Sequence, residues 1–128
     1  MRYLLDTHTL LWLATDSPRL SPTVIEIFQS PHSEALLSVA SLWEIAIKVS
    51  MGRLDLGGDY ATAMAYHLQK AQVELIAITF IHCTIAASLP FYHRDPFDRM
   101  LVAQALSEQI PLISADSTLG AYGIEQIW

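Results

Sequence analysis

RYLLDTHTLLWLA, residues 2–14, begins with a short apolar run that ends abruptly at Asp6 and resumes after a brief polar interval. This order predicts a β-strand over Arg2 to Leu5, a turn that carries the acid, and then a helix. Pro111 to Ala115 repeats the first part of the pattern, because an apolar run again stops at a carboxylate, here Asp116. The two segments therefore predict strands that each end at an acidic side chain.

The chain between these strands alternates between helical and extended patterns. The expected helices cover residues 22–29, 41–51, 60–70, 81–89 and 96–108, and the additional strands cover 35–39, 73–78 and 124–128. Strands that alternate with helices form a mainly parallel sheet with helices on both faces. We therefore predict a three-layer α/β/α fold with a central sheet of four to five strands, in a single domain that spans residues 1–128.

The composition points away from membranes and disulfide scaffolds. Hydrophobic residues make up 52% of the chain, but no apolar run approaches the roughly 18 residues of a membrane span. Asp6 and His8 interrupt the N-terminal apolar stretch, which is therefore unlike a secretion signal. The single cysteine, Cys83, cannot form an internal disulfide, and its apolar neighbours predict a buried thiol. We expect a cytoplasmic protein without membrane contact.

The net charge of −6 comes from thirteen acidic residues against seven lysines and arginines. This excess argues against strong nonspecific binding to nucleic acid. If four of the thirteen acids converge on metal ions, nine remain against the seven bases, and the rest of the surface is close to neutral. The acidic character is thus compatible with one concentrated metal site.

Asp6 and Asp116 each follow directly after a predicted strand. Because ligands of parallel α/β sheets bind beyond the carboxyl ends of the strands, we expect both carboxylates at one functional edge. Either acid alone is also typical of a turn or a helix cap, since aspartate readily accepts hydrogen bonds from nearby backbone N–H groups. Their shared position favours a site over two unrelated caps.

Glu44 allows two interpretations. The segment Ser41-Leu42-Trp43-Glu44 matches a capping box, in which the glutamate would only satisfy free N–H groups at the start of a helix. Lys48, one turn further along, could also neutralise its charge. The alternative is that Glu44 joins Asp6 in an acidic site, and the sequence pattern leaves both interpretations open.

Asp98 lies in the first turn of the helix predicted from Pro96, with Asp95 as its N-cap residue. At helical spacing Asp98 shares a face with apolar residues, namely Leu101, Val102 and Ala105. A carboxylate on a core-facing surface is costly unless it is paired, protonated or bound to a metal ion. Asp98 is therefore harder to explain as a purely structural residue than the other acids.

The candidate acids predict a site for a hard cation. Oxygen ligands without cysteine or paired histidine ligands suit Mg²⁺ or Mn²⁺ better than zinc. The five histidines do not show the spacing of zinc proteases. His8 and His93 lie near the acids in sequence, and we expect each to be solvated or hydrogen-bonded.

Four motifs, in this order, resemble those of the PIN-domain nucleases, and in particular the VapC-like toxins of bacterial type II toxin–antitoxin pairs. They are Tyr3-Leu4-Leu5-Asp6-Thr7-His8, Ser41-Leu42-Trp43-Glu44-Ile45, His93-Arg94-Asp95-Pro96-Phe97-Asp98-Arg99 and Leu112-Ile113-Ser114-Ala115-Asp116. The resemblance implies an endoribonuclease that hydrolyses RNA phosphodiester bonds with Mg²⁺ or Mn²⁺. It also implies that the catalytic and metal-binding residues are Asp6, Glu44, Asp98 and Asp116.

The same resemblance implies further contacts and partners. Thr7 and Ser117 are expected to assist as polar neighbours of the acids and the substrate, and Lys48, Arg94 and Arg99 are candidates for holding the RNA backbone. The expected protein partners are a cognate antitoxin and a second copy of the chain in a homodimer. The high apolar content agrees with such interfaces.

Two alternative functions remain open at this point. A phosphoaspartyl hydrolase also places an aspartate after the first strand of an α/β sheet, but it would need a second aspartate two residues on, where this chain has His8. A non-catalytic interaction module would use its acids only as caps and its apolar excess only as an interface.

Overall fold

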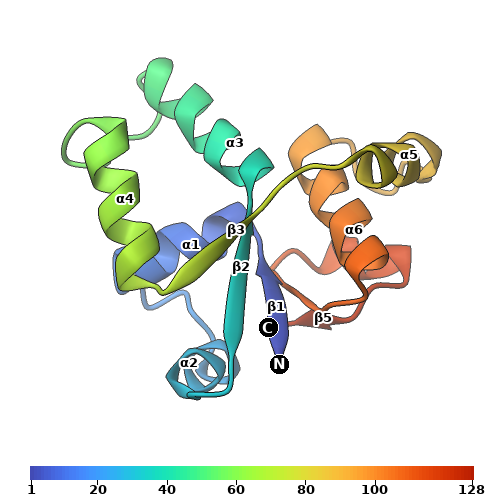
Figure 1. Ribbon diagram of the computed structural model, residues 1–128, viewed down its shortest axis with the longest axis horizontal. Coiled ribbons are helices and arrows are strands. Elements are labelled where there is room, and N and C mark those ends of the chain that lie inside the picture. Colours follow the sequence, from blue (N-terminus) through green and yellow to red (C-terminus); the bar gives the residue numbers. More distant parts are fainter.

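Five short parallel strands form the centre of the fold in the computed structural model, which describes residues 1–128 (Figure 1). The sheet has the strand order β3-β2-β1-β4-β5, and every neighbouring pair is parallel. The strands are β1 (Arg2–Leu5), β2 (Glu34–Ser38), β3 (Val73–Ile76), β4 (Leu112–Ile113) and β5 (Gln126–Ile127). The predicted sheet is confirmed, with five strands and no antiparallel member.

Six α-helices and one 3₁₀-helix connect the strands and cover both faces of the sheet. They are α1 (Thr7–Ala14), α2 (Pro22–Gln29), α3 (Val39–Ser50), α4 (Tyr60–Lys70), α5 (Phe80–Ser88), α6 (Pro96–Glu108) and the 3₁₀-helix η1 (Ser117–Tyr122). In Figure 1 the helices α1 to α4 lie on one side of the sheet, and α5 and α6 lie on the other. This arrangement is the expected three-layer α/β/α architecture.

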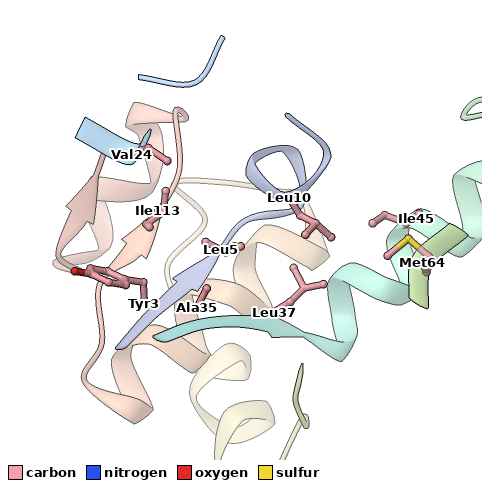
Figure 2. Close-up of a cluster of buried hydrophobic side chains, with 9 residues drawn as sticks. All are labelled: Tyr3, Leu5, Leu10, Val24, Ala35, Leu37, Ile45, Met64 and Ile113. Atoms are coloured by element: carbon pink, nitrogen blue, oxygen red, sulfur yellow. The ribbon is translucent and has the colours of Figure 1, made fainter. Parts of the chain in front are cut away.

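Alternating side chains of the strands build two separate cores. On β1, Tyr3 and Leu5 join a cluster that includes Leu10 of α1 and Ile45 of α3 (Figure 2), whereas Leu4 faces the opposite way. The second cluster contains Leu4 together with buried residues of α6 and η1. Successive side chains of a strand point to opposite faces, so a sheet buried on both sides needs apolar residues at every position. The uninterrupted run at the start of the chain meets that need.

Helix α3 begins earlier than the sequence pattern suggested. Its N-cap is Ser38, whose side chain accepts a hydrogen bond from the backbone N–H of Ala40, and Val39 is the first helical residue. Ser41 therefore lies inside the first turn and does not cap the helix. The capping-box interpretation of Glu44 is wrong for this reason, since its proposed partner is in the wrong position.

Two further observations concern the surface. Cys83 is exposed on α5, so the expected buried thiol is wrong: its helix turns it to solvent in spite of the apolar neighbours in sequence. None of the helices has the length and apolar character that crossing a membrane would require.

Candidate metal centre

The ends of β1 and β4 bring two of the predicted acids together. The two strands are neighbours, with Leu5 paired to Ile113, and the backbone N–H of Asp6 donates to the carbonyl oxygen of Ile113 over 3.0 Å. Beyond this point a cleft of about 330 Å³ opens. Its lining residues are Asp6, His8, Trp12, Arg19, Asp98, Ala115 and Asp116. Three of the four predicted acids thus share one cleft at the carboxyl edge of the sheet.

Asp6 is both the N-cap of α1 and a wall of the cleft. Its Oδ1 accepts hydrogen bonds from the backbone N–H of Thr9 (2.8 Å) and from the Thr9 hydroxyl (2.6 Å). The Thr9 hydroxyl also lies 3.2 Å from the carbonyl oxygen of Ile113, which ties the helix start to β4. Oδ2 accepts no hydrogen bond within the chain, and the residue is 5% exposed. Capping therefore fixes the carboxylate and leaves one oxygen unengaged.

Asp98 sits one turn into α6, where Asp95 is the N-cap and accepts from the backbone N–H groups of Phe97 and Asp98. Neither carboxylate oxygen of Asp98 accepts a hydrogen bond within the chain, although Oδ2 lies 3.4 Å from Nε2 of His93. The side chain is only 25% exposed. Asp98 is thus a partly desolvated carboxylate whose oxygens both lack a hydrogen-bond donor.

Glu44 reaches the site from α3 and is held from two sides. The hydroxyl of Thr7 donates to its Oε1 over 2.7 Å, and Lys48 Nζ lies 3.0 Å from its Oε2. Glu44 is buried, with 8% of its surface exposed, and it does not line the cleft itself. Its charge still acts on the site, because it is one of the groups that raise the pKa of Asp98. Glu44 therefore influences the site through its charge, although it does not line the cleft.

Asp116 caps η1 and contacts a histidine that the sequence pattern did not assign to the site. Its Oδ1 accepts from the backbone N–H of Thr118 (3.0 Å) and from the Thr118 hydroxyl (2.7 Å). Its Oδ2 lies 2.9 Å from Nε2 of His93. His93, Asp98 and Asp116 present oxygen and nitrogen atoms that all lie within 4.8 Å of one another. Two segments that are distant in sequence, residues 93–98 and the start of η1, thus place possible ligand atoms close together.

The electrostatics of the cluster differ between its members. Burial, the charge of Asp95 and the charges of Glu44 and Asp6 raise the pKa of Asp98 to about 7, against the opposing influence of His93. For Asp116, burial favours the neutral form, but hydrogen bonds from Thr118 and His93 outweigh it and lower the pKa. A carboxyl group crowded by like charges is one that a cation would stabilise in its ionised form.

The donor set fits a hard divalent cation. Asp6 and Asp98 offer three carboxylate oxygens without hydrogen-bond partners, and Asp116 is oriented beside them. Carboxylate oxygens in an open cleft with room for water are the ligands that Mg²⁺ and Mn²⁺ prefer. The raised pKa of Asp98 agrees with this geometry, because burial and the charges of nearby acids disfavour its ionised form more than His93 favours it.

Comparison with known proteins decides the family. The family model of the PIN domain matches residues 3–124, which is nearly the whole chain. The chain is a PIN-domain protein. PIN domains are nucleases. No curated protein matches the sequence at a significant level.

Solved structures share the fold of this PIN domain at low sequence identity. VapBC2 from Rickettsia felis, bound to a DNA fragment from its promoter, contains a chain with a TM-score of 0.78 and 13% identity, over 99% of this chain and 98% of that chain. For VapBC-1 from nontypeable Haemophilus influenzae the TM-score is 0.69 and the sequence identity 18%, over 99% of this chain and 97% of that chain. For a toxin–antitoxin complex from Klebsiella pneumoniae the TM-score is 0.68 and the sequence identity 14%, over 98% of this chain and 96% of that chain.

Arg99 differs from the sequence-based expectation that it holds RNA. It is 8% exposed, and its guanidinium donates to the carbonyl oxygens of Pro90 (2.8 Å), Ala86 (3.1 Å) and Leu89 (3.1 Å). It also lies over the ring of Phe91, 4.1 Å from the centroid. Because its donors are engaged inside the PIN domain, Arg99 is a structural anchor, and the expected contact with RNA is wrong for this residue.

The other expected contacts fall into two groups. Thr7 is buried against Glu44 and Lys48 is paired with it, so both orient that acid. Arg94 and Ser117 are exposed beside Asp95 and Asp116, where they remain candidates for contact with a substrate.

Four residues with functional side chains near the acids were not among the predicted site residues of this PIN domain. His93 joins the acids, and His8, Trp12 and Arg19 line the cleft, with the Arg19 guanidinium 5.7 Å from the centre of the Trp12 ring. The sequence carried a signal for the two histidines, since His8 ends the motif of Asp6 and His93 opens the motif that contains Asp98. Arg19 lies in a connection whose path no periodic pattern predicts.

Proposed function

We propose that this PIN domain is an endoribonuclease that uses Mg²⁺ or Mn²⁺ and acts as the toxin of a toxin–antitoxin pair. The observation that carries the proposal is the set of free carboxylate oxygens on Asp6 and Asp98, in one cleft with Asp116 at the carboxyl edge of a nuclease fold. The fold similarity to proteins from toxin–antitoxin complexes supports the biological context.

Each residue has a part that follows from its contacts. Asp6 and Asp98 would bind the cation directly, and Asp116 and Glu44 would complete the site or orient water around it. A bound Mg²⁺ or Mn²⁺ supplies a Lewis acid for the scissile phosphate and lowers the pKa of a water molecule for in-line attack. Arg19 is the cation that lines the cleft, so we assign it the contact with the RNA phosphate.

RNA cleavage by the purified protein tests this proposal. Labelled single-stranded RNA and DNA of the same sequence are incubated with the protein and Mg²⁺, Mn²⁺ or a chelator. We expect the RNA to be cleaved when Mg²⁺ or Mn²⁺ is present, and we expect no cleavage of DNA and none with the chelator. Asp6→Asn and Asp98→Asn should each lower the rate by more than the roughly 10- to 100-fold that is typical for loss of a group that merely orients a ligand. Glu26→Gln, which removes an exposed acid from α2, is the matched control. Full activity in both aspartate variants would refute the metal site.

Exposed aromatic residues support the proposed protein partners. Phe80, Phe91 and Trp43 are 87%, 77% and 63% exposed, and Ile81 of α5 is 62% exposed. Large apolar groups at the surface mark interfaces, and we assign them to a homodimer and to an antitoxin segment. An antitoxin that places a basic side chain in the acidic cleft would compete with the metal ion, so raising the metal concentration should weaken its inhibition.

A further inference from the structure

His93 lies between two acids that come from different parts of the chain. Its Nε2 is 2.9 Å from Oδ2 of Asp116, the cap of η1, and 3.4 Å from Oδ2 of Asp98 in α6. The imidazole is only 18% exposed. A nitrogen in this position could either bind the metal ion or hold the carboxylates that do, and the two roles require opposite tautomers of the neutral ring.

The backbone determines which tautomer is present. The N–H of Asp95 donates to Nδ1 of His93 over 3.1 Å, so Nδ1 accepts and carries no proton. In the neutral ring the proton then resides on Nε2, which donates to Asp116. His82 shows the same device away from the site, because the N–H of Thr79 points at its Nδ1 (3.1 Å) and Nε2 lies 3.0 Å from Glu108. With its proton on Nε2, His93 is a hydrogen-bond donor and cannot be a ligand at that atom.

A network of hydrogen bonds holds His93 in place. Its backbone N–H donates to the Tyr122 hydroxyl over 2.9 Å, and that hydroxyl donates to the carbonyl oxygen of Pro90 over 2.7 Å. The Arg99 guanidinium also donates to Pro90 (2.8 Å) and lies 3.4 Å from the carbonyl oxygen of His93. The segment that carries His93 is therefore fixed from both sides by buried or half-buried donors.

We propose that His93 is a positioning residue of the metal centre, which holds Asp116 beside Asp98 through an Nε2–H of fixed tautomer, and that Tyr122 and Arg99 keep His93 in register. The inference rests on the proposed metal-dependent function. Three other residues of the motif then have distinct roles, since Asp95 caps α6 and its backbone N–H sets the tautomer, Asp98 binds the ion, and Arg99 anchors the segment.

Metal affinity and the protonation pattern of the imidazole test this role independently of cleavage. By calorimetry with Mn²⁺, His93→Leu should bind the ion roughly 10- to 100-fold more weakly than wild type, as expected when a partner that orients a ligand is lost. His93→Gln keeps an N–H donor at a similar reach and should restore most of the affinity. Tyr122→Phe should lower the affinity for Mn²⁺ roughly fivefold, which is the effect of losing one hydrogen bond. His32→Leu, which changes an exposed histidine, is the control.

Nitrogen-15 NMR with diamagnetic Mg²⁺ separates positioning from direct ligation. We expect the Nε2–H signal of His93, assigned by its loss in His93→Gln, to persist when the ion binds. Loss of that proton on adding Mg²⁺, or wild-type affinity in His93→Leu, would overturn the inference and leave the metal-dependent function standing. A wild-type protein that binds neither Mg²⁺ nor Mn²⁺ would instead overturn the proposed function, and the role of His93 with it.

Discussion

Replacing Asp98 with asparagine should stabilise the metal-free protein above neutral pH. The pKa of Asp98 is raised to about 7, first by burial and then by the charges of Asp95, Glu44 and Asp6. Asparagine has nearly the same shape and carries no charge, so the variant removes the cost of burying a charge, and the repulsion by nearby acids, without leaving a cavity. Loss of a purely structural carboxylate would have the opposite effect, because its hydrogen bonds would be lost.

The magnitude follows from the two pKa values. In the unfolded chain the carboxyl titrates near its ordinary value of 3.8, and in the folded protein it titrates at about 7. The folded state therefore binds a proton that the unfolded state releases, and stability falls as the pH rises between these values. The difference of about 3 pH units corresponds to about 4 kcal/mol, and we expect about 2 to 4 kcal/mol because the side chain is 25% exposed.

Urea unfolding of wild type and Asp98→Asn at about pH 5 and about pH 8, with a chelator present, measures this difference. The free energy of unfolding of the variant should exceed that of wild type at the higher pH, and the gap should narrow at the lower pH. Glu26→Gln, on the exposed face of α2, should follow wild type at both. Added Mg²⁺ should stabilise wild type and not Asp98→Asn. A variant less stable than wild type at the higher pH would refute the account of Asp98 as a repelled, metal-binding acid.

Three further predictions concern the bases and the surface. Arg19→Gln should raise KM for RNA several-fold and flatten its salt dependence, with kcat little changed, and an unchanged KM would contradict its role in the cleft. Arg99→Gln should instead destabilise the fold by about 3 kcal/mol or more, seen as a lower urea midpoint, because several buried carbonyl groups lose their donor. Light scattering over a concentration series should show a dimer that Trp43→Asp weakens, and a monomer at every concentration would count against the homodimer.

The fold was predictable because local signals agreed with one another. The apolar run before Asp6 is buried on both faces as β1, and the cap and proline before Asp98 begin α6 at the expected residue. The start of α3 was not predictable from its pattern. Ser38 ends β2 and caps α3 at the same time, so the strand passes into the helix without the polar turn that a boundary normally shows.

The site was predictable only in part, because side-chain engagement depends on contacts that are distant in sequence. Arg99 looks like any basic residue next to Asp98, and its burial depends on carbonyl groups at the end of α5 that the fold brings against it. His93 looks like a loop histidine until η1 places Asp116 beside it. Neither partner can be read from spacing along the chain.

The structural and functional interpretations of these acids are not alternatives. Asp6 caps α1 with Oδ1 and leaves Oδ2 free, while Asp116 caps η1 with Oδ1 and meets His93 with Oδ2. A cap fixes the carboxylate in one orientation through short hydrogen bonds to the backbone, and a metal ligand needs the same fixed orientation. Asp98 is the exception, because Asp95 and not Asp98 caps its helix. Asp98 is also the acid whose pKa is raised. The acid without hydrogen bonds is therefore the one that gains most from a bound cation.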